Sequence, residues 1–230
     1  RPHMRAFHYA WMGDFMGCFL FFTIAPLLPE IQLSLGLTTQ QIWLSNTIPL
    51  FADFVSRLAS GSLTDKYGSR ILMGIYLMVV AIPVGCTGFV NTIAGLCLLR
   101  FAIATIAAVT VFDPNWVQKM FAKEIVGSAT GLTAGLGNVA PGCAQIVMGT
   151  LLFPLFRDVV YAGDSEPDAD AADKAWRTVC AIPATVAFLL GILIIKTSDD
   201  SPLGDYKTLI RQGSMQSTSS LQSFQESATD

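Results

Sequence analysis

Long apolar runs separated by short charged segments constrain the fold of this chain more than any other feature. A helix of roughly 20 apolar residues crosses a hydrocarbon core about 30 Å thick. We predict membrane-spanning helices over residues 9–28, 41–63, 71–90, 92–111, 125–153 and 175–195. Only 13% of the residues are charged, against about 25% in a soluble domain. The sequence therefore predicts an all-α membrane protein with six transmembrane helices.

Several classes of function have no support in the sequence. No basic patch interleaves with aromatic residues, so we expect no nucleic-acid binding. The five cysteines lack metal-ligand or paired spacing, and we interpret them as small buried hydrophobic residues. Both histidines, His3 and His8, precede the first predicted helix, which leaves an intramembrane serine hydrolase without its base. We therefore expect no enzyme, no metal site and no cofactor.

Lys and Arg are distributed unevenly between the two sides of a six-helix bundle. The side with both termini and the turns after the second and fourth helices carries Arg1, Arg5, Lys66, Arg70, Lys119, Lys123, Lys196, Lys207 and Arg211. The other side carries Arg157, Lys174 and Arg177 among acidic residues. Because basic residues favour the cytoplasmic side, we predict that both termini are cytoplasmic. Residues 197–230 are polar and rich in Ser and Gln, and we predict a disordered tail or linking segment there.

The second predicted helix carries two charges in its interior, Asp53 and Arg57. An Arg at this depth costs roughly 2.5–3.5 kcal/mol on insertion scales, so its default interpretation is functional. The two residues are four positions apart and share one helix face. Two interpretations stay open. Either they form an intrahelical ion pair that neutralises both, or the planar guanidinium binds a planar oxyanion and Asp53 tunes or competes for its charge.

The fifth predicted helix is rich in glycine. Its glycines are Gly127, Gly131, Gly135, Gly137 and Gly142. The first three recur every four residues and leave one helix face without side chains, so a neighbouring helix can approach closely. Asn138 adds one carboxamide to this strip and could donate to an anion at short range. Pro141 should kink the helix and free backbone groups at a similar depth.

Other polar residues in or next to the predicted helices have more than one interpretation. Asp14 either reaches the nearby membrane interface or lines a path. Arg100 either pairs with Asp14 or Asp113 or contacts a substrate. Thr38 or Thr39 can cap the start of the second helix, because a hydroxyl oxygen accepts from free amide groups there.

Residues 61–70, with the sequence GSLTDKYGSR, resemble the cytoplasmic loop motif of the major facilitator superfamily. That motif joins the second and third helices in each half of those transporters. The matching residues are Gly61, Asp65, Lys66, Gly68 and Arg70. The resemblance implies a turn made by the glycines and an acid that latches to a neighbouring helix end.

Residues 134–142, with the sequence AGLGNVAPG, look like the nitrate signature of the nitrate/nitrite porter family within this superfamily. That family includes the eukaryotic high-affinity nitrate transporters. Further similar segments are 1–8, 25–29, 100–101, 116–121, 175–177 and 198–202. The resemblance implies that Arg57 binds nitrate, that Asn138 lies near the same site, and that Gly135 and Gly137 let the helices close. Ala140 and Pro141 depart from the family pattern, which runs on in glycine.

Members of that family consist of two six-helix halves, so the resemblance implies the N-terminal half of a major facilitator fold. We expect a missing C-terminal half, with this chain being a fragment, a truncated gene product or a true half-size protein. The implied function is secondary transport of nitrate or nitrite across the plasma membrane, coupled to protons. Coupling is implied because a negative-inside membrane potential of 100 mV opposes the entry of an anion by about 2.3 kcal/mol per charge. The alternatives are a transport-incompetent half-size or regulatory membrane protein, and a porter for another solute.

Overall fold

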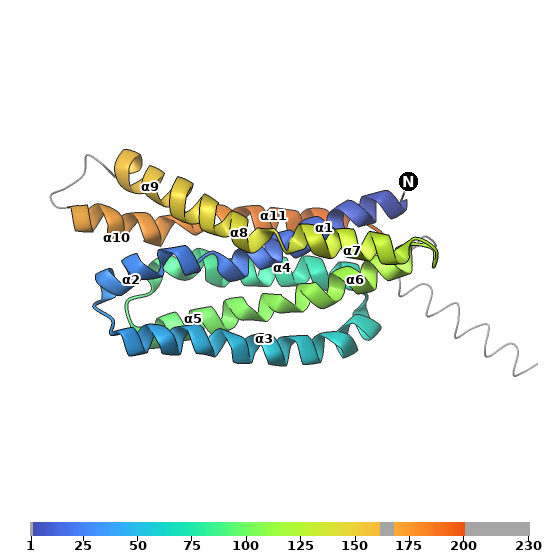
Figure 1. Ribbon diagram of the computed structural model, residues 1–230, viewed down its shortest axis with the longest axis horizontal. Coiled ribbons are helices and arrows are strands. Elements are labelled where there is room, and N and C mark those ends of the chain that lie inside the picture. Colours follow the sequence, from blue (N-terminus) through green and yellow to red (C-terminus); the bar gives the residue numbers. More distant parts are fainter. Residues whose placement is uncertain (1, 162–167, 201–230) are drawn as a thin grey trace, which may run out of the picture.

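The computed structural model describes residues 2–161 and 168–200, which are almost entirely helical. The helices run nearly parallel to the long axis of the molecule (Figure 1). The first half of the chain forms α1 (Pro2–Phe22), η1 (Ala25–Leu27), α2 (Leu28–Leu35), α3 (Thr39–Tyr67), α4 (Ser69–Gly85), η2 (Cys86–Phe89), α5 (Ile93–Ala104) and η3 (Thr105–Ala108). The second half forms α6 (Val109–Met120), α7 (Val126–Gly137), α8 (Ala140–Ala144), η4 (Gln145–Leu152), α9 (Phe153–Leu155), η5 (Phe156–Val160), α10 (Asp168–Val179) and α11 (Ala181–Thr197).

Consecutive short elements join into rods long enough to cross a membrane. Within the described residues, five rods have both the length and the apolar composition of a membrane span: His3–Leu35, Ser69–Phe89, Ile93–Met120, Val126–Val160 and Asp170–Thr197. α3 is 29 residues long, but its composition leaves it outside this group. Length and composition thus establish five membrane-capable helices, not the six predicted.

The side chains of α3 are arranged with small residues inside and apolar residues outside. Its buried residues recur every three or four positions and are Ser45, Pro49, Ala52, Ser56, Ser60 and Thr64. Its outer face exposes Leu50, Phe51, Phe54, Val55 and Leu58. This arrangement is typical of helix packing in membranes, where small and hydroxylated residues face neighbouring helices. The low mean hydropathy of α3 has two sources: the hydroxylated residues of its buried face, and charged residues such as Arg57, Asp65 and Lys66 that are exposed.

Hydroxyl groups on the inner face of α3 are satisfied within the protein. The Ser56 hydroxyl donates to the Thr105 carbonyl oxygen at 2.5 Å, which joins α3 to η3. The Ser60 hydroxyl donates to the carbonyl of Arg57 at 2.6 Å, and that of Thr64 donates to Ser60 at 2.7 Å. Because hydrocarbon offers polar groups no partner, such internal hydrogen bonds are what allow this face to lie in a membrane.

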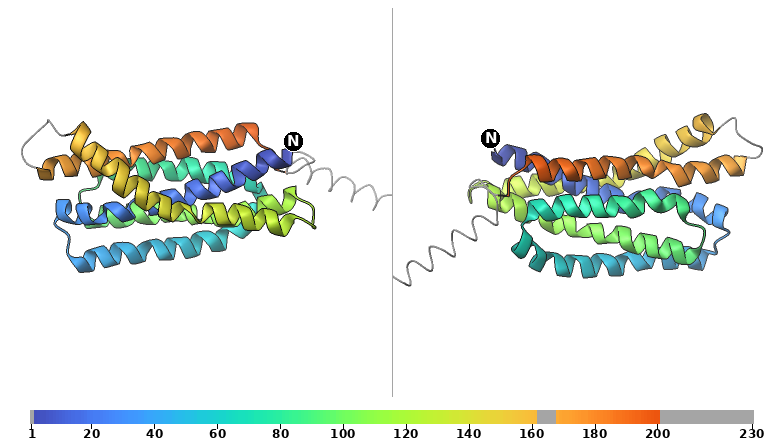
Figure 2. Two further views of the ribbon diagram at one scale, coloured as in Figure 1. Left: turned by 45° about the horizontal axis from the view of Figure 1, so that its top comes forward. Right: turned by 180° about the vertical axis from the view of Figure 1, so that it is seen from behind.

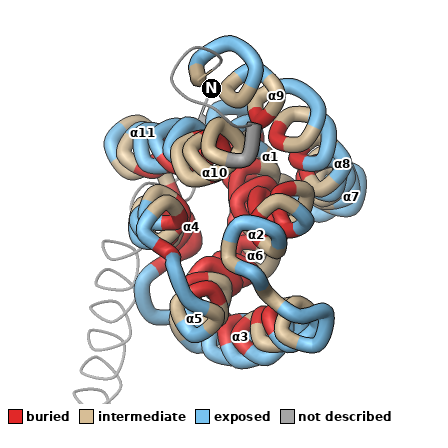
Figure 3. The backbone as a smooth tube through the Cα atoms, turned by 90° about the vertical axis from the view of Figure 1, so that its left-hand side faces the viewer, coloured by how far each residue is buried: buried red, intermediate tan, exposed pale blue. Residues whose placement is uncertain are grey.

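The core of the bundle lies where α1, α4 and α6 meet (Figure 3). Phe112 and Trp116 of α6 are fully buried there, together with Met73 of α4. The Phe112 ring packs edge-on against the ring of Tyr76, with 5.1 Å between centroids. α3 and α5 lie on one side of this core, and α7 and α8 on another (Figures 1 and 3).

Helix ends follow local sequence signals in two places. Thr38 caps α3 as predicted: its hydroxyl accepts from the Gln41 amide, and the Gln41 side chain accepts from the Thr38 amide. The helix after α7 is interrupted as predicted from Pro141, because α7 ends at Gly137 and α8 begins at Ala140. The first rod continues to Leu35, past the predicted end at residue 28, and stops at Gly36, whose φ of 60° is left-handed.

Both ends of the described chain lie at the same end of the bundle. The Arg5 guanidinium contacts the Asp199 carboxylate at 2.8 Å, and the Thr197 and Tyr9 hydroxyls are hydrogen-bonded to each other at 2.7 Å. At the opposite end, Arg177 donates to the carbonyl oxygens of Gly88 and Val90 at 2.8 and 2.9 Å. The tail predicted over residues 197–230 lies outside the described residues beyond position 200.

α4 and α11 approach each other closely through glycine (Figure 2, right). A Cβ added at Gly191 would lie 2.7 Å from the carbonyl oxygen of Gly74 and 2.7 Å from Met78 Cγ. Real Cβ atoms do not come so near to backbone, so a side chain at position 191 forces the two helices apart.

We expect Gly191→Ala to destabilise the bundle by about 1–3 kcal/mol, the usual cost of overpacking. This corresponds to a fall of about 2–4 °C in the unfolding midpoint per kcal/mol for a chain of this length. Gly61→Ala is the matched control: nothing lies within 4 Å of its added Cβ, and Ala favours a helix by about 1 kcal/mol. Thermal unfolding in detergent measures both; an unchanged midpoint for Gly191→Ala would contradict the close approach.

Candidate functional site

Arg57 lines a narrow cavity of about 200 Å³ between α1, α3, η3 and α6. The lining residues are Gly17, Cys18, Phe21, Phe22, Leu50, Asp53, Arg57, Ile106, Ala107, Val109 and Thr110. Asp53 and Arg57 are its charged members, and most of the wall is apolar. A charge acts more strongly in such a poorly polarisable cavity than in water. The cavity is therefore suited to a small ion rather than to a large polar solute.

Arg57 and Asp53 form the ion pair that their spacing predicts. The Arg57 Nε donates to Asp53 Oδ1, and the two side chains are 48% and 25% exposed. Among the described residues, no hydrogen bond engages the two terminal nitrogens of Arg57. The pair therefore uses one N–H of the guanidinium and leaves its terminal fork open. The ion-pair and anion-binding interpretations are compatible in this geometry.

Asn138 lies in the break between α7 and α8 and is exposed. Its Nδ2 donates to the Ala134 carbonyl oxygen at 2.8 Å, one turn back on its own helix. Asn138 does not line the cavity at Arg57. Its neighbour Gly137 comes nearer: an added Cβ there would overlap the Asp14 carboxylate, and Asp14 lies within electrostatic range of Arg57. The described part of the chain thus links Arg57 to Gly137 through Asp14, but leaves Asn138 outside the cavity.

The other glycines of this segment form an open face. Nothing in the described structure lies within 4 Å of a Cβ added at Gly127, Gly131, Gly135 or Gly142. The predicted strip therefore exists along α7 and α8, but no described helix packs on it. Gly137 alone of these residues faces a neighbour within the bundle.

The segment resembling a loop motif is helical as far as Tyr67, and the expected glycine turn is confined to Gly68. Gly61 and Asp65 lie inside α3, which continues to Tyr67. The whole connection to α4 is Gly68, whose φ of 85° is a left-handed value that glycine adopts without strain. One residue with positive φ is enough to reverse the chain here, so the preceding residues remain helical. The Lys66 ammonium lies 5.4 Å from the ring centroid of Tyr67.

Arg70, at the end of this segment, ties the start of α4 to the end of α11. Its Nη1 donates to the Ser198 carbonyl oxygen at 2.5 Å, and its Nε lies 3.4 Å from Asp200 Oδ2. The backbone N–H of Arg70 donates to Asp200 Oδ1 at 3.1 Å. The motif therefore contains a latch between helix ends, in which this arginine takes part.

Arg100 does not pair with an acid, which corrects one of the two interpretations above. Its Nη1 donates to the Ser45 hydroxyl at 3.0 Å and to Asn46 Oδ1 at 2.7 Å. These contacts join α5 to the first turns of α3. The sequence offered one signal for them, since a predicted membrane helix that begins with adjacent polar residues needs partners for those residues.

Asp14 and Asp113 lie close together instead. Both are buried, at 3% and 1% exposure, and Asp113 acts electrostatically on Asp14. The sequence presented each of them as an isolated charge in or beside a predicted helix. Their proximity depends on how α1 and α6 are rotated, which spacing along the chain does not reveal.

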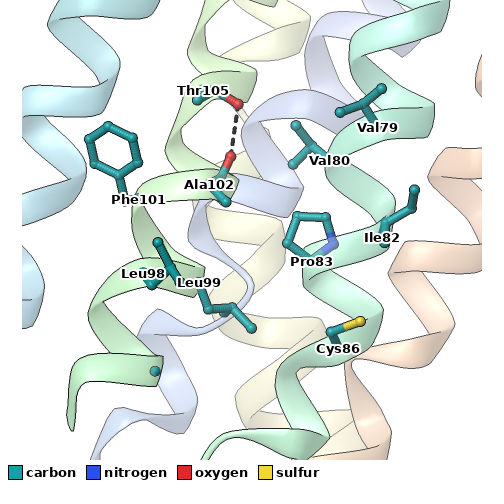
Figure 4. A pocket seen from close by; sticks show the side chains of 11 residues that line it. Val79, Val80, Ile82, Pro83, Cys86, Leu98, Leu99, Phe101, Ala102 and Thr105 are labelled. Carbon is teal, nitrogen blue, oxygen red and sulfur yellow. Dashed lines mark hydrogen bonds between the residues drawn. The ribbon is translucent and has the colours of Figure 1, made fainter.

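A second cavity, of about 680 Å³, lies between α4 and α5 and has no charged residue in its wall. Figure 4 shows Val79, Pro83 and Leu98 around it, and the Thr105 hydroxyl already donates to the Ala102 carbonyl oxygen at 2.7 Å. This apolar cavity offers nothing to orient an anion, so the smaller cavity at Arg57 is the better candidate site.

The pattern of the Major Facilitator Superfamily matches residues 10–217. The chain belongs to the major facilitator superfamily. This membership confirms the superfamily expected from residues 61–70, and the helices found here are consistent with the N-terminal half of its fold. The chain is accordingly an integral membrane protein.

Within this superfamily, the chain is similar to curated nitrate transporters. It is 31% identical to "High-affinity nitrate transporter 2.3" of Oryza sativa over 94% of this chain and 40% of the relative. It is 28% identical to "Nitrate transporter 2.1" of Chlamydomonas reinhardtii, over 94% of this chain and 38% of the relative. It is 25% identical to "Nitrate/nitrite transporter NrtP" of Nostoc punctiforme, over 94% of this chain and 41% of the relative. The chain therefore spans about two fifths of the length of these superfamily members.

We expect Asp53→Asn to leave this superfamily member folded and to strengthen its binding of a small anion. An exposed i,i+4 ion pair contributes only about 0.3–0.5 kcal/mol to stability. Two opposite charges 4 Å apart interact by about 1 kcal/mol even in water, so a guanidinium freed from its acid should bind an anion at least about fivefold more tightly. Titration of the purified chain with nitrate, with Asp158→Asn as the control acid, measures the change. Weaker binding by Asp53→Asn would show that Asp53 positions Arg57 instead of competing for it.

Proposed function

We propose that this chain forms the N-terminal half of a secondary active transporter for nitrate or nitrite in the plasma membrane. Its termini would be cytoplasmic and its transport coupled to protons. The observation that carries the proposal is the open terminal fork of Arg57 in a narrow, mostly apolar cavity. The similarity to curated nitrate transporters supports the same substrate.

The proposal includes six membrane helices, with α3 as the sixth. Its outer face exposes large apolar side chains such as Phe51 and Phe54. Its inner hydroxyls are satisfied by neighbouring carbonyl oxygens. A helix with this distribution can face lipid despite its low mean hydropathy, because its inner hydroxyls have partners inside the protein and its outer face is rich in apolar side chains.

The chemistry of the cavity favours a small oxyanion over an organic solute. The terminal nitrogens of Arg57 lie in one plane and can donate two parallel hydrogen bonds to two oxygens of a planar anion. An organic solute with several hydroxyls would need several polar partners, and leaving its groups unpaired costs roughly 1–3 kcal/mol each. The cavity wall offers few such groups beyond Asp53 and Thr110.

The open glycine face of α7 and α8 supports a missing second half. A further helix can approach the backbone closely along this face, which is formed by Gly127, Gly131, Gly135 and Gly142. We propose that helices of the second half pack there and close over the substrate. Asn138 borders this face, so its carboxamide would meet the anion from the side that the second half covers.

We expect Arg57→Lys to weaken nitrate binding by roughly 10- to 100-fold and to lower nitrate uptake sharply. Lysine keeps the charge but cannot form the planar fork, and one hydrogen bond to a charged group contributes about 1.5–3 kcal/mol. Binding is measured on the purified chain, and uptake on the complete transporter that contains it.

Arg5→Lys is the matched control for this substitution. Arg5 is an exposed arginine paired with Asp199 at the end of the bundle, remote in the fold from the cavity. The Arg5→Lys variant should bind nitrate as tightly as the unaltered chain. Nitrate binding that survives Arg57→Lys unchanged would remove Arg57 from the substrate site.

A further inference from the structure

Two carboxyl groups, Asp14 of α1 and Asp113 of α6, are buried in the middle of the bundle. They are 3% and 1% exposed. Acids in membrane helices are costly when ionised and are usually paired with a cation or hydrogen-bonded. The proposed substrate site uses neither carboxyl directly, so their retention in the core calls for a separate explanation.

Neither acid has a cationic partner among the residues that the structure describes. Neither oxygen of Asp113 accepts a hydrogen bond there. Asp14 Oδ1 has only the thiol of Cys18, at the long distance of 4.0 Å. Asp113 itself acts on Asp14 as a like charge. Ionising both therefore places two unneutralised negative charges in a medium that stabilises neither.

The neighbouring elements add little positive charge. From α3, Arg57 lies within electrostatic range of Asp14, but its Nε already holds Asp53. From α4, Tyr76 packs on Phe112, the residue before Asp113. The remaining elements supply these groups: Cys18 on α1 itself, and Thr133 and Gly137 on α7.

One hydroxyl group, that of Thr133 on α7, neighbours Asp113. The single hydrogen of this hydroxyl is donated to the Thr130 carbonyl oxygen at 3.1 Å. The lone pairs of Thr133 Oγ1 then remain available as acceptors, and only a protonated Asp113 can donate to them.

Gly137 fixes the position of Asp14 against α7. An added Cβ at Gly137 would overlap Asp14 Oδ2, so the carboxyl lies directly on the backbone of α7. The break between α7 and α8 begins at the next residue. A movement of α7 relative to α1 therefore changes the surroundings of this carboxyl, which is what a site with alternating access requires.

We propose that Asp14 and Asp113 together bind one exchangeable proton, and that this proton is the one coupled to the anion at Arg57. The inference rests on the proposed function for the coupling. Two neighbouring buried carboxylates share a proton because both cannot remain ionised. As one anion binds, one proton from the solvent adds to one carboxylate oxygen. The bound anion and the bound proton together carry no net charge.

The coupling follows from the position of Arg57. Arg57 is a positive charge within electrostatic range of Asp14, and an anion bound to Arg57 offsets that charge. Anion binding therefore promotes proton uptake by the acids, and by linkage proton binding promotes anion binding to the same degree. With one proton taken up per anion, the dissociation constant for nitrate rises by at most about tenfold per pH unit.

The test uses the purified chain in lipid vesicles and nitrate as the probe. Infrared difference spectroscopy detects the carbonyl stretch of a protonated carboxylic acid, which shifts in heavy water. We expect such a band near neutral pH, lost or displaced in Asp14→Asn and in Asp113→Asn and kept in Asp158→Asn, whose acid is exposed and paired with Arg157. Nitrate should strengthen the band, and the pH dependence of nitrate affinity should disappear in both core variants.

Asp113→Glu covers the case in which an Asn variant does not fold, because it keeps the acid and should move the band without removing it. A spectrum in which no core variant alters a protonated-carboxyl band overturns the shared proton. A band that sodium ions abolish at constant pH also overturns it, in favour of a bound cation.

The coupling and the proposed function fail in different ways. Nitrate binding that depends on Arg57 but takes up no proton overturns the coupling and leaves the anion site standing. A protonated-carboxyl band in a chain that does not bind nitrate overturns the anion site and, with it, the coupling.

Discussion

The fold depends on one constraint: hydrocarbon offers no hydrogen-bond partner, so polar groups must find one inside the bundle. α3 shows the consequence most clearly. Its hydroxyls face inward, where Ser56 donates to the Thr105 carbonyl oxygen, and its large apolar side chains face outward. Arg100 follows the same logic by donating to Ser45 and Asn46. A helix of modest mean hydropathy thereby becomes compatible with a membrane.

The candidate functional groups are among the polar groups whose hydrogen bonding is incomplete in the described structure. Arg57 engages one N–H with Asp53 and leaves its terminal fork open. Asp113 is buried with no hydrogen bond to either oxygen in the described structure. Unsatisfied groups cost stability, so their persistence points to ligands that satisfy them during function. An anion and a proton are the two smallest ligands that would do so, and their charges cancel.

Sequence reasoning succeeded where the signal is local. The apolar runs predicted the helices, Thr38 or Thr39 predicted a capped start, which Thr38 provides, and Pro141 predicted the interruption after α7. It was incomplete where several local solutions exist. The glycines of residues 61–70 indicated a turn, and Gly68 makes it alone, while Gly61 stays inside α3. Arg100 had two open interpretations, a pair with an acid or a substrate contact, and neither included its partners Ser45 and Asn46.

The sequence by itself determined that the chain is helical and membrane-embedded, that Arg57 shares a helix face with Asp53, and which superfamily it resembles. These properties depend on composition and on spacing along one helix. Only the tertiary structure decided that Asp14 and Asp113 lie near each other, that Gly137 touches Asp14, and that the other glycines of this segment face open space. The physical reason is that each of these depends on how separate helices are rotated about their axes. Packing of whole helix faces sets that rotation, and no short segment encodes it.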